Sequence, residues 1–498
     1  MEVNTIVHHI DNIKDQILEY LSKRSNLQQI AKITSVSAAT YYVIHKLYIG
    51  FFGPLANAPG PFSSRFISFP KLTANTANGK LFTVLKELHT EYGHVVRLSP
   101  QAVSVSDKAL IKQILVTDDL KKEPFYDSVS SRRDRRIMSP AFSIKYINSL
   151  EPFMTSVTES LLEKIDKEIE NNSETVDIWN LYQCLALDII GETAFGQSFR
   201  MIENNSHYIT KAIGKELREF AIVHTFPILS KLFLKNASRF DPKLEKFVQD
   251  IIEKRMASSQ KRTDILQYLI DSQMAEDKQD RLTTKEIVAE MVLILIAGSE
   301  TTSNTLGFAI YELVSHPDKL EKLYNEIDQL TPHGKLFEHE ELKQAPYLNA
   351  VIYETLRLDT VAAGLGRITT EKTVLGNQYV LPKNTIIFAN IHDIQTCEDY
   401  WDRPNEFIPE RWLPEQTEVR PADAEAFIPF SSGSRNCIGK NFALQEMRHA
   451  LSALLKHYDI SATKQELEDA KERSSYLTMQ ITKNSLKIHF KHRKAETS

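Results

Sequence analysis

The segment Thr284–Ser315 has the pattern of one uninterrupted helix, and it constrains the fold more than any other part of the chain. Thr283 and Glu286 have the spacing of a capping box, which predicts where the helix starts. The next helix breaker is Pro317, so the helix would be about 48 Å long. Residues 291–297 are apolar on all sides, which predicts burial. Such a helix must cross the interior of one large domain.

The composition is that of an ordinary globular protein. The 498 residues are 42% apolar and 25% charged, and the formal net charge is −5. Proteins that bind nucleic acids usually have a strong basic excess, so we expect no nucleic-acid partner. The chain has 3 cysteines, which argues against a disulfide framework and for a reducing compartment.

Most of the chain has helical periodicity, and two segments have the alternation of β-hairpins. Residues 146–169 and 441–455 are apolar on one side and charged on the other, as amphipathic helices are. Residues 94–107 and 374–390 alternate apolar and polar positions, and the second segment contains a Gly-Asn turn. We therefore expect a mainly α fold with a minor β-sheet, which is an α+β class. No repeat or linker interrupts residues 59–498, so a single domain is expected there.

The N-terminal segment, residues 1–58, contains an apolar stretch at 33–54. This stretch is about as long as a bilayer core requires, although His45 and Lys46 interrupt it. We expect a membrane anchor at 33–54, and a soluble amphipathic segment packed on the main domain is the alternative. The Pro-Gly-Pro sequence at 59–61 would form a stiff hinge after it. The aromatic residues that suit a membrane interface are Tyr41, Tyr42, Tyr48, Phe51 and Phe52.

The segment 430–439 places Cys437 directly before a helical run. The free N–H groups and the dipole of a helix start would stabilise a thiolate at this position. Gly433 and Gly439 allow the backbone to bend around the sulfur and to approach a flat cofactor. Arg435 can pair with a carboxylate of that cofactor. The alternative is a buried structural cysteine, which is the usual state of a free thiol.

With Phe430, Gly433, Arg435, Cys437 and Gly439 in this spacing, the chain resembles the cytochrome P450 superfamily and most of all its fungal microsomal members. The haem-binding signature of that family is Phe-x-x-Gly-x-Arg-x-Cys-x-Gly. The resemblance implies the cytochrome P450 fold, with the long helix over a haem b group in a catalytic domain at 59–498. It also implies that Cys437 is the thiolate ligand of the iron.

A polar cluster at residues 299–304 interrupts the apolar part of the long helix, which is unfavourable in a core without a function. Residues 297–301 match the family pattern Ala-Gly-x-Asp/Glu-Thr. The resemblance therefore implies that Gly298 lies over the haem and that Glu300 and Thr301 are the catalytic pair beside the oxygen. Small residues at 361–366 would leave room above the haem.

Two further sets of residues come from the family resemblance. Glu354 and Arg357, three apart on a helix, can pair with each other, although such pairs are more often a solvated surface. The resemblance adds Arg411 and makes the three a buried structural triad. Arg135 and Arg367 match positions that bind the haem propionates, and a structural ion pair is the alternative for each. Ser131 stands where the family often has an aromatic residue or His.

The implied activity is that of a haem-thiolate monooxygenase that inserts one atom of O2 into a C–H bond of a lipophilic substrate, with steroids or terpenoids favoured. Electrons would come from NADPH through an NADPH-cytochrome reductase, with cytochrome b5 as a further donor. The expected location is the endoplasmic reticulum membrane, with the catalytic domain facing the cytosol. The alternatives are an isomerase or dehydratase that needs no external O2, a non-catalytic haem carrier, and a hydroxylase of xenobiotics or fatty acids.

Two surfaces would serve these partners. Residues 220–235 are apolar with spaced lysines and could dip into the membrane, or they form a plain core helix. A basic face could dock an acidic reductase, and solvated helix surface is the alternative. The residues of this face would be Arg132, Arg133, Arg135, Arg136, Lys440, Arg448 and Lys456.

Overall fold

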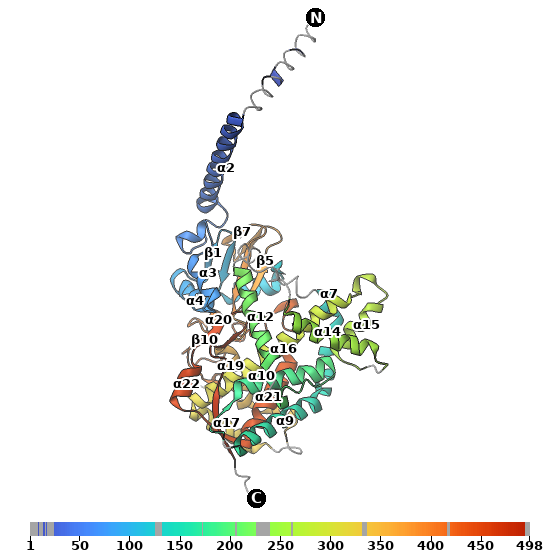
Figure 1. The fold of residues 1–498 in the computed structure, drawn as a ribbon. Helices are drawn as coiled ribbons and strands as arrows, with labels where there is room; N and C mark the ends of the chain where they lie inside the picture. The colour runs from blue at the N-terminus through green and yellow to red at the C-terminus, as the bar shows by residue number, and fades with distance from the viewer. Residues whose placement is uncertain are drawn as a thin grey trace.

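Helix α16 (Thr284–Ser315) runs through the middle of the body in this computed structural model (Figure 1). It begins at the predicted capping box: Thr283 N–H donates to Glu286 Oε2 at 2.7 Å, and Glu286 N–H donates to Thr283 Oγ1 at 3.3 Å. It ends where His316 leaves helical geometry and Pro317 starts the next helix. The structure describes residues 24–124, 132–171, 173–204, 207–225, 240–259, 262–330, 336–415 and 419–493, with residues 8, 13, 14 and 16.

Helix α10 (Ile178–Ile190) packs closely along α16. A Cβ on Gly307 would lie 2.3 Å from the Trp179 ring, so glycine is required for this approach. The Trp179 ring also meets the Phe308 ring edge-on, with the ring centroids 5.2 Å apart. Both aromatic side chains are fully buried, and burial on this scale stabilises the contact by several kcal/mol, at about 25 cal/mol per Å². The interior of the body is therefore built around α16.

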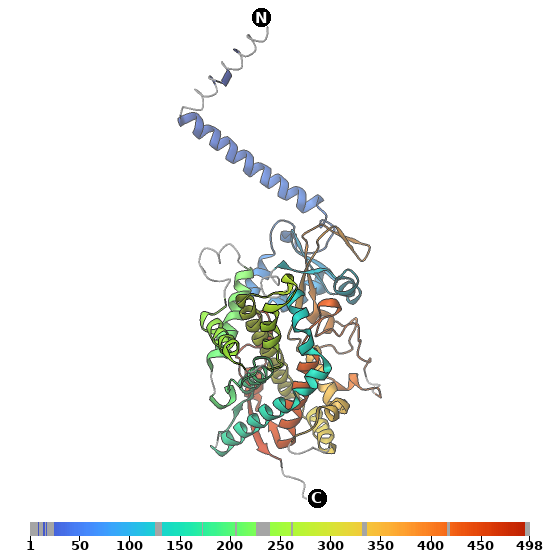
Figure 2. The ribbon, with the colours of Figure 1, turned by 90° about the vertical axis from the view of Figure 1, so that its right-hand side faces the viewer.

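Further helices make up most of the rest of the body (Figures 1 and 2). They are α3 (Pro70–Ala77), α4 (Leu81–Tyr92), α5 (Lys108–Lys112), α7 (Arg132–Met138), α8 (Ile144–Ser149), α9 (Glu151–Glu170), α11 (Met201–Asn204), α12 (His207–Thr225), α14 (Pro242–Ala257), α15 (Ile265–Asp271), α17 (Pro317–Gln329), α18 (His339–Gln344), α19 (Pro346–Leu358), α20 (Ile391–Gln395), α21 (Lys440–His457) and α22 (Lys464–Ala470).

The prediction of one helix over 146–169 is wrong at its start. The segment divides into α8 and α9 at Leu150, and Pro152 lies in the first turn of α9. Proline has no N–H to donate to the preceding turn, so the first helix ends and a second begins. The helix expected over 441–455 is confirmed within α21, which extends it at both ends.

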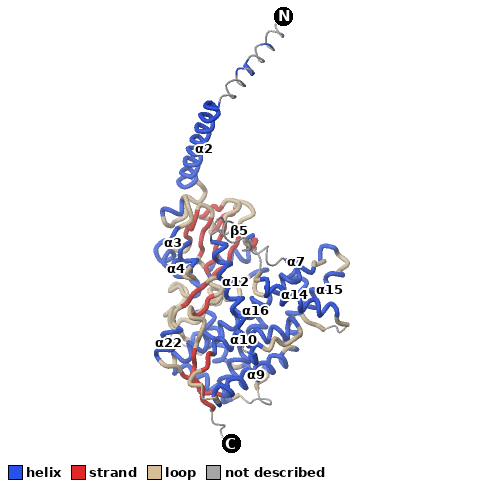
Figure 3. Tube along the Cα trace, viewed as in Figure 1, coloured by secondary structure: helices blue, strands red, loops and turns tan. Residues whose placement is uncertain are grey.

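A five-stranded sheet lies at one end of the body and joins distant parts of the sequence (Figure 3). Its strands, in spatial order, are β1 (Val95–Ser99), β2 (Ala102–Val105), β8 (Ile386–Asn390), β5 (Gly364–Ile368) and β3 (Lys121–Lys122). The β1–β2 hairpin confirms the prediction for 94–107. β2 pairs with β8 in parallel, with Ala102 opposite Ile386, which no local pattern indicated.

The second predicted hairpin is confirmed for its first half. β6 (Thr373–Leu375) pairs with β7 (Tyr379–Leu381) across Gly376 and Asn377, which both have positive φ. Residues 386–390 instead form β8 of the main sheet. Two smaller sheets complete the fold: β4 (Val176–Asp177), β12 (Lys487–His492) and β9 (Tyr458–Ser461), and the pair β10 (Arg473–Ser475) and β11 (Met479–Ile481). The mainly α class with minor sheets is confirmed.

Helix α2 (Arg24–Phe52) extends away from the body (Figures 1 and 2). In the part of the chain that the structure describes, no helix is both long and apolar enough to cross a membrane, so the transmembrane segment expected at 33–54 is not found. Polar residues recur along that stretch: Thr34, Ser35, Ser37, Thr40, His45 and Lys46.

The chain enters the body through the predicted Pro-Gly-Pro segment. Arg97 N–H on β1 donates to the Pro59 carbonyl at 2.6 Å, and Arg97 Nη1 donates to the Leu55 carbonyl at 2.9 Å. These bonds fix the segment against the sheet. Of the predicted membrane-facing stretch 220–235, the first residues belong to α12, and 226–239 lie outside the described residues.

Candidate active site

The loop before α21 holds Cys437 in a tight turn. Cys437 N–H donates to the Phe430 carbonyl at 2.8 Å, and Asn436 N–H donates to the Gly433 carbonyl at 3.2 Å. Gly433 has φ 76°, and a Cβ there would lie 2.0 Å from the Leu115 carbonyl oxygen. Only glycine therefore allows the loop to lie against residues 113–117. At Gly439 a Cβ would be 3.9 Å from Cys437 Sγ, an ordinary van der Waals contact, so the packing does not require glycine there.

The thiol of Cys437 has accessible surface but is closely surrounded by protein. Burial raises the pKa of the Cys437 thiol, and four groups oppose that rise. The N–H groups of Gly439 and Lys440 bond to the sulfur, and the charges of Arg135 and Lys122 favour the thiolate. The N–H groups expected at a helix start act on the sulfur, but burial outweighs them, and the ligand role of Cys437 stays a prediction. The accessible part of the sulfur therefore lies on an inner surface of the protein and not on its outside.

One face of α16 keeps accessible surface in the middle of the body. Ile294, Ala297 and Thr301 lie on this face at helical spacing, whereas Ser299 and Glu300 beside them are buried. Thr301 Oγ1 donates to the Ala297 carbonyl at 2.8 Å. A buried helix keeps such a stripe uncovered only where something other than protein can lie against it.

Charge interactions connect α16 with the cysteine loop. Glu290, two turns before Ala297 on α16, raises the pKa of Lys122. Lys122 in turn lowers the pKa of the Cys437 thiol. Lys122 therefore interacts with both α16 and the cysteine loop, which are far apart in the sequence.

Lys122 lies among three arginines, and Lys122 and Arg135 also act on the Cys437 thiol. Burial lowers the pKa of Lys122, and the charges of Arg367, Arg135 and Arg435 lower it further. Lys122 and Arg367 are paired neighbours on β3 and β5. Haem has two propionate carboxylates, and a group of this charge would relieve the repulsion among these cations. The residues present fit a haem group bound by Cys437.

Glu300 is the buried acid of the candidate site, with 3% of its surface exposed. Burial raises the pKa of Glu300 to about 7, and a hydrogen bond from Asn304 opposes the rise. One carboxyl oxygen, Oε2, has no hydrogen-bond partner among the described residues. A carboxyl of this pKa exchanges a proton readily near neutral pH.

Arg435 and Arg135 bond within the protein. Arg435 Nη1 donates to the Asp119 carbonyl at 2.8 Å and also pairs with the Asp119 carboxylate. Asp119 further accepts from Ser434 Oγ at 2.8 and 2.9 Å, and its φ of 41° is unusual for a residue with a side chain. Arg135 Nη2 donates to Asn436 Oδ1 at 2.8 Å. Propionate binding by these two arginines stays a prediction.

Gly298 contacts α10 instead of leaving open space. A Cβ on Gly298 would lie 2.5 Å from Ile190 Cδ1, so glycine is needed for this helix contact, and its place over the haem stays a prediction. The small residues at 361–366 were expected to leave space above the haem. At Gly364 the Phe388 ring fills this space, because a Cβ there would lie 2.1 Å from the ring. Glycine there serves packing within the sheet.

The expected basic face is interrupted. Arg448 is 8% exposed, and its Nε donates to Asn349 Oδ1 at 2.7 Å, so it is not on the surface. Lys456 is half-buried and lies 3.7 Å from Asp328. Arg136 and Lys440 are exposed. The structure does not describe Ser131 or the side chains of Arg132 and Arg133.

Glu354, Arg357 and Arg411 form a fully buried charge cluster. Glu354 Oε1 accepts from Arg357 Nη2 at 2.8 Å and from Arg411 Nε at 3.0 Å. Glu354 Oε2 accepts from Arg357 Nε at 2.9 Å and from Trp412 Nε1 at 3.0 Å. Arg357 Nη1 donates to the carbonyls of Gln395 and Pro404, at 2.8 and 2.7 Å. The cluster therefore joins α19 to the chain that leads to the cysteine loop.

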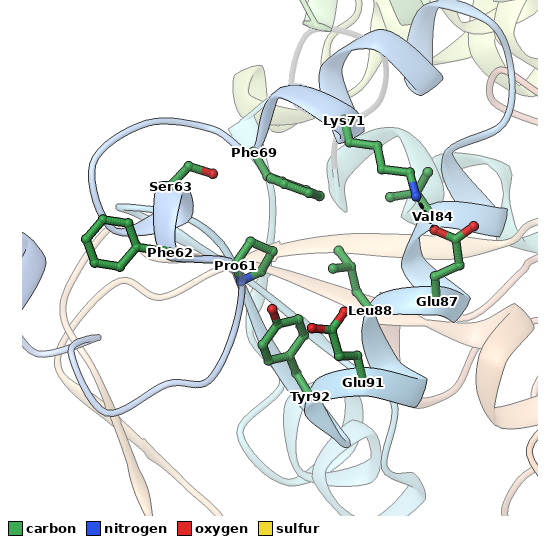
Figure 4. Close-up of a pocket in the computed structure, with 10 residues that line it drawn as sticks. All are labelled: Pro61, Phe62, Ser63, Phe69, Lys71, Val84, Glu87, Leu88, Glu91 and Tyr92. Atoms are coloured by element: carbon green, nitrogen blue, oxygen red, sulfur yellow. Dashed lines mark hydrogen bonds and ion pairs between the residues drawn. The ribbon is translucent and has the colours of Figure 1, made fainter.

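A separate pocket lies beside α3 and α4 (Figure 4). Its volume is about 410 Å³, and Pro61, Phe69 and Leu88 are among its lining residues. Two of its charged side chains, Lys71 and Glu87, pair with each other, and Glu91 also lines it. The pocket contains neither Cys437 nor any residue of the polar segment of α16, so it is not part of the candidate active site.

Three residues of the region were not predicted from the sequence. Asn304 follows Glu300 by one helical turn, so the i, i+4 spacing was a usable signal. Asp119 and Lys122 are far from Cys437 in the sequence, and no local pattern marked them. Their placement depends on the pairing of β3 with β5 and on the contact of residues 113–117 with the cysteine loop.

A mainly α fold, a cysteine at a helix start and a polar segment in the central helix define a haem-thiolate class of protein. The family model Cytochrome P450 matches residues 59–488. The chain belongs to the cytochrome P450 family, and it is an oxidoreductase of the monooxygenase type. The family implies a haem cofactor.

The chain is similar to several named members of this family. Cytochrome P450 monooxygenase acrD of Aspergillus aculeatus is 34% identical, over 84% of this chain and 88% of that protein. Cytochrome P450 monooxygenase FUS8 of Gibberella moniliformis is 30% identical, over 99% of this chain and 100% of that protein. Cytochrome P450 3A31 of Mesocricetus auratus is 30% identical, over 76% and 81%.

Removing the acid of the buried cluster tests its structural role. Glu354→Ala leaves two guanidinium groups buried without their carboxylate, so the free energy of unfolding should fall by about 3–5 kcal/mol. Glu340→Ala is the matched control, because Glu340 pairs with Lys343 at the same i, i+3 spacing but both side chains are exposed. It should cost less than about 0.5 kcal/mol. Denaturant unfolding measures both, and equal losses would contradict the role of the cluster.

Proposed function

We propose that this protein inserts one atom of O2 into a C–H bond of a lipophilic substrate, with a haem b group held by Cys437. The observation that carries the proposal is that Lys122 and Arg135 act on the helix-start thiol of Cys437, while the central helix α16 keeps an accessible face beside the buried acid Glu300. The second oxygen atom leaves as water after it accepts electrons and protons. Steroids or terpenoids are the favoured substrates.

The haem, when bound, supplies the iron that activates O2. Cys437 would hold it through the thiolate, and the N–H groups of Gly439 and Lys440 would stabilise the charge on the sulfur. The cations beside the thiolate would bind the propionate carboxylates. These cations are Lys122, Arg135, Arg367 and Arg435.

Glu300 and Thr301 are proposed to deliver protons. The Thr301 hydroxyl lies on the accessible face of α16, while the Glu300 carboxyl is buried beside it. Because the pKa of Glu300 is about 7, its Oε2 can hold a proton or release it near neutral pH. An enzyme that uses O2 needs such a supply of protons, whereas an isomerase or dehydratase does not.

The apolar side chains on the accessible face of α16 also favour a lipophilic substrate. Leu293, Ile294 and Ala297 give this face an apolar surface of partly covered side chains. An apolar ligand would remove this surface from water, which favours binding by about 25 cal/mol per Å².

Electrons would come from NADPH through an NADPH-cytochrome reductase, with cytochrome b5 as a further donor. The exposed Arg136 and Lys440 lie close in sequence to Arg135 and Cys437, so an acidic partner that contacts them would dock near the thiolate.

We also propose that the protein associates with the endoplasmic reticulum membrane, with the catalytic domain facing the cytosol. The aromatic side chains Tyr41, Tyr42, Tyr48 and Phe52 of α2 are at least 60% exposed, and such side chains favour the bilayer interface.

The membrane proposal predicts the effect of a truncation. Deleting residues 1–56 removes α2 and should move much of the protein from the membrane to the soluble fraction without changing its haem spectrum. Fractionation of cells that express both forms measures this. Unchanged partition would show that α2 is not the attachment.

The ligand assignment predicts one sensitive cysteine. Cys437→Ser should abolish the carbon-monoxide difference spectrum of thiolate-bound haem, because only a thiolate gives that spectrum. Cys184→Ser and Cys397→Ser are the controls and should keep it, since Cys184 lies within α10 and Cys397 follows α20, so neither belongs to the loop before α21. A normal spectrum from the Cys437 variant would end the assignment.

The proposed role of Thr301 in proton delivery predicts that loss of its hydroxyl uncouples NADPH oxidation from product formation. Thr301→Ala should keep haem and substrate binding but form several-fold less product per NADPH oxidised, with more hydrogen peroxide, because protons no longer arrive in order. Glu300→Gln should slow turnover by a factor on the order of 10².

The measurement uses reductase-reconstituted enzyme with product, NADPH and peroxide quantified together. Thr302→Ala, at the buried neighbour of Thr301, is the control and should stay coupled. Wild-type coupling in Thr301→Ala would favour the isomerase or dehydratase alternative.

A further inference from the structure

Asn304 connects the buried acid of α16 to the strand β11. It is fully buried, and its Nδ2 donates to the Met479 carbonyl at 3.1 Å. Glu300 lies one helical turn earlier on the same side of α16, and the Asn304 amide, acting as a donor, lowers the pKa of its carboxyl. Met479 N–H donates to the Val361 carbonyl at 2.8 Å, so the carbonyl that Asn304 contacts is itself held in place.

The Met479 carbonyl determines which way the Asn304 amide faces. A carbonyl oxygen only accepts hydrogen bonds, so it requires the NH2 group of the amide on its side. If the amide were reversed, two oxygens would face each other in the protein interior, which is unfavourable. The NH2 group has a second hydrogen, and this hydrogen is available to the Glu300 carboxyl.

We propose that Asn304 is a positioning residue that orients the Glu300 carboxyl for proton transfer and ties it to β11. This inference rests on the proton-carrier role proposed for Glu300. The amide fixes the carboxyl through one oxygen and leaves Oε2, which has no partner in the described part of the chain, to exchange the proton.

Asn304 is the main polar group that affects the pKa of the Glu300 carboxyl. Burial raises the pKa of Glu300 to about 7, and the hydrogen bond from Asn304 lowers it. Among the described residues of the helices packed around α16, no charged side chain contributes to this pKa. A donor that stabilises the ionised carboxyl in this way should hold the pKa down by about one unit.

The test follows the Glu300 proton directly in the full-length, haem-loaded protein. Infrared difference spectroscopy detects the C=O stretch of a protonated buried carboxyl as pH changes, and loss of the band in Glu300→Gln assigns it. Asn304→Leu keeps the shape of the side chain but removes the amide, so the midpoint should rise by about one pH unit. Asn304→Ala should raise it too if leucine is not accommodated. Asn304→Gln, which restores an amide, should return the midpoint toward wild type.

A second measurement separates this inference from the proposed function. Product formed per NADPH is recorded against pH for the same variants with reductase, and its inflection should rise with the infrared midpoint. Thr305→Val is the control, because the Thr305 hydroxyl bonds to the Thr301 carbonyl at 2.8 Å instead of to Glu300.

Each outcome of the two measurements has a distinct meaning. An unchanged infrared midpoint in both Asn304→Leu and Asn304→Ala would overturn the positioning role. A raised midpoint with an unchanged coupling profile would confirm the hold of Asn304 on Glu300 and overturn the proton-carrier role of Glu300. An equal rise of the infrared midpoint in Thr305→Val would show that loss of any polar side chain on α16 raises it. That outcome would also overturn the inference.

Discussion

The rest of the structure depends on the buried carboxylate of Glu354. Two guanidinium groups, an indole N–H and a backbone N–H converge on its two oxygens, and the Trp401 ring lies 5.2 and 5.9 Å from the Arg357 and Arg411 guanidinium groups. Charges in the protein interior are stable only when they are paired and fully hydrogen-bonded. The cluster therefore fixes the segment 402–412 onto α19, and this segment leads to the loop that positions Cys437.

The candidate site has opposite electrostatics on its two sides. Lys122, Arg135 and two N–H groups favour negative charge on the Cys437 sulfur, although burial raises the pKa of the thiol overall. On α16, burial of Glu300, with no charge of the described residues acting on it, favours the neutral acid. Burial raises the pKa of both the thiol and the carboxyl, and cations oppose that rise at the thiol alone.

Local patterns predicted the elements that local forces control. The capping box at Thr283, the helix before His316 and the β1–β2 hairpin are confirmed because each depends on neighbours in the sequence. The single helix over 146–169 was wrong because Pro152 outweighs a favourable apolar period. Arg448 was expected on the surface, but the packing of α21 among other helices buries it.

The sequence by itself determined the central helix, the helix-start cysteine and the polar segment at 299–304, because each is a pattern within a few turns of chain. Only the tertiary structure brought Lys122 beside Arg367, through the pairing of β3 with β5, and within reach of the Cys437 thiol. It alone placed Asp119 on Arg435 and the Met479 carbonyl on Asn304. Contacts between residues hundreds of positions apart depend on how whole elements pack, and no local period encodes that packing.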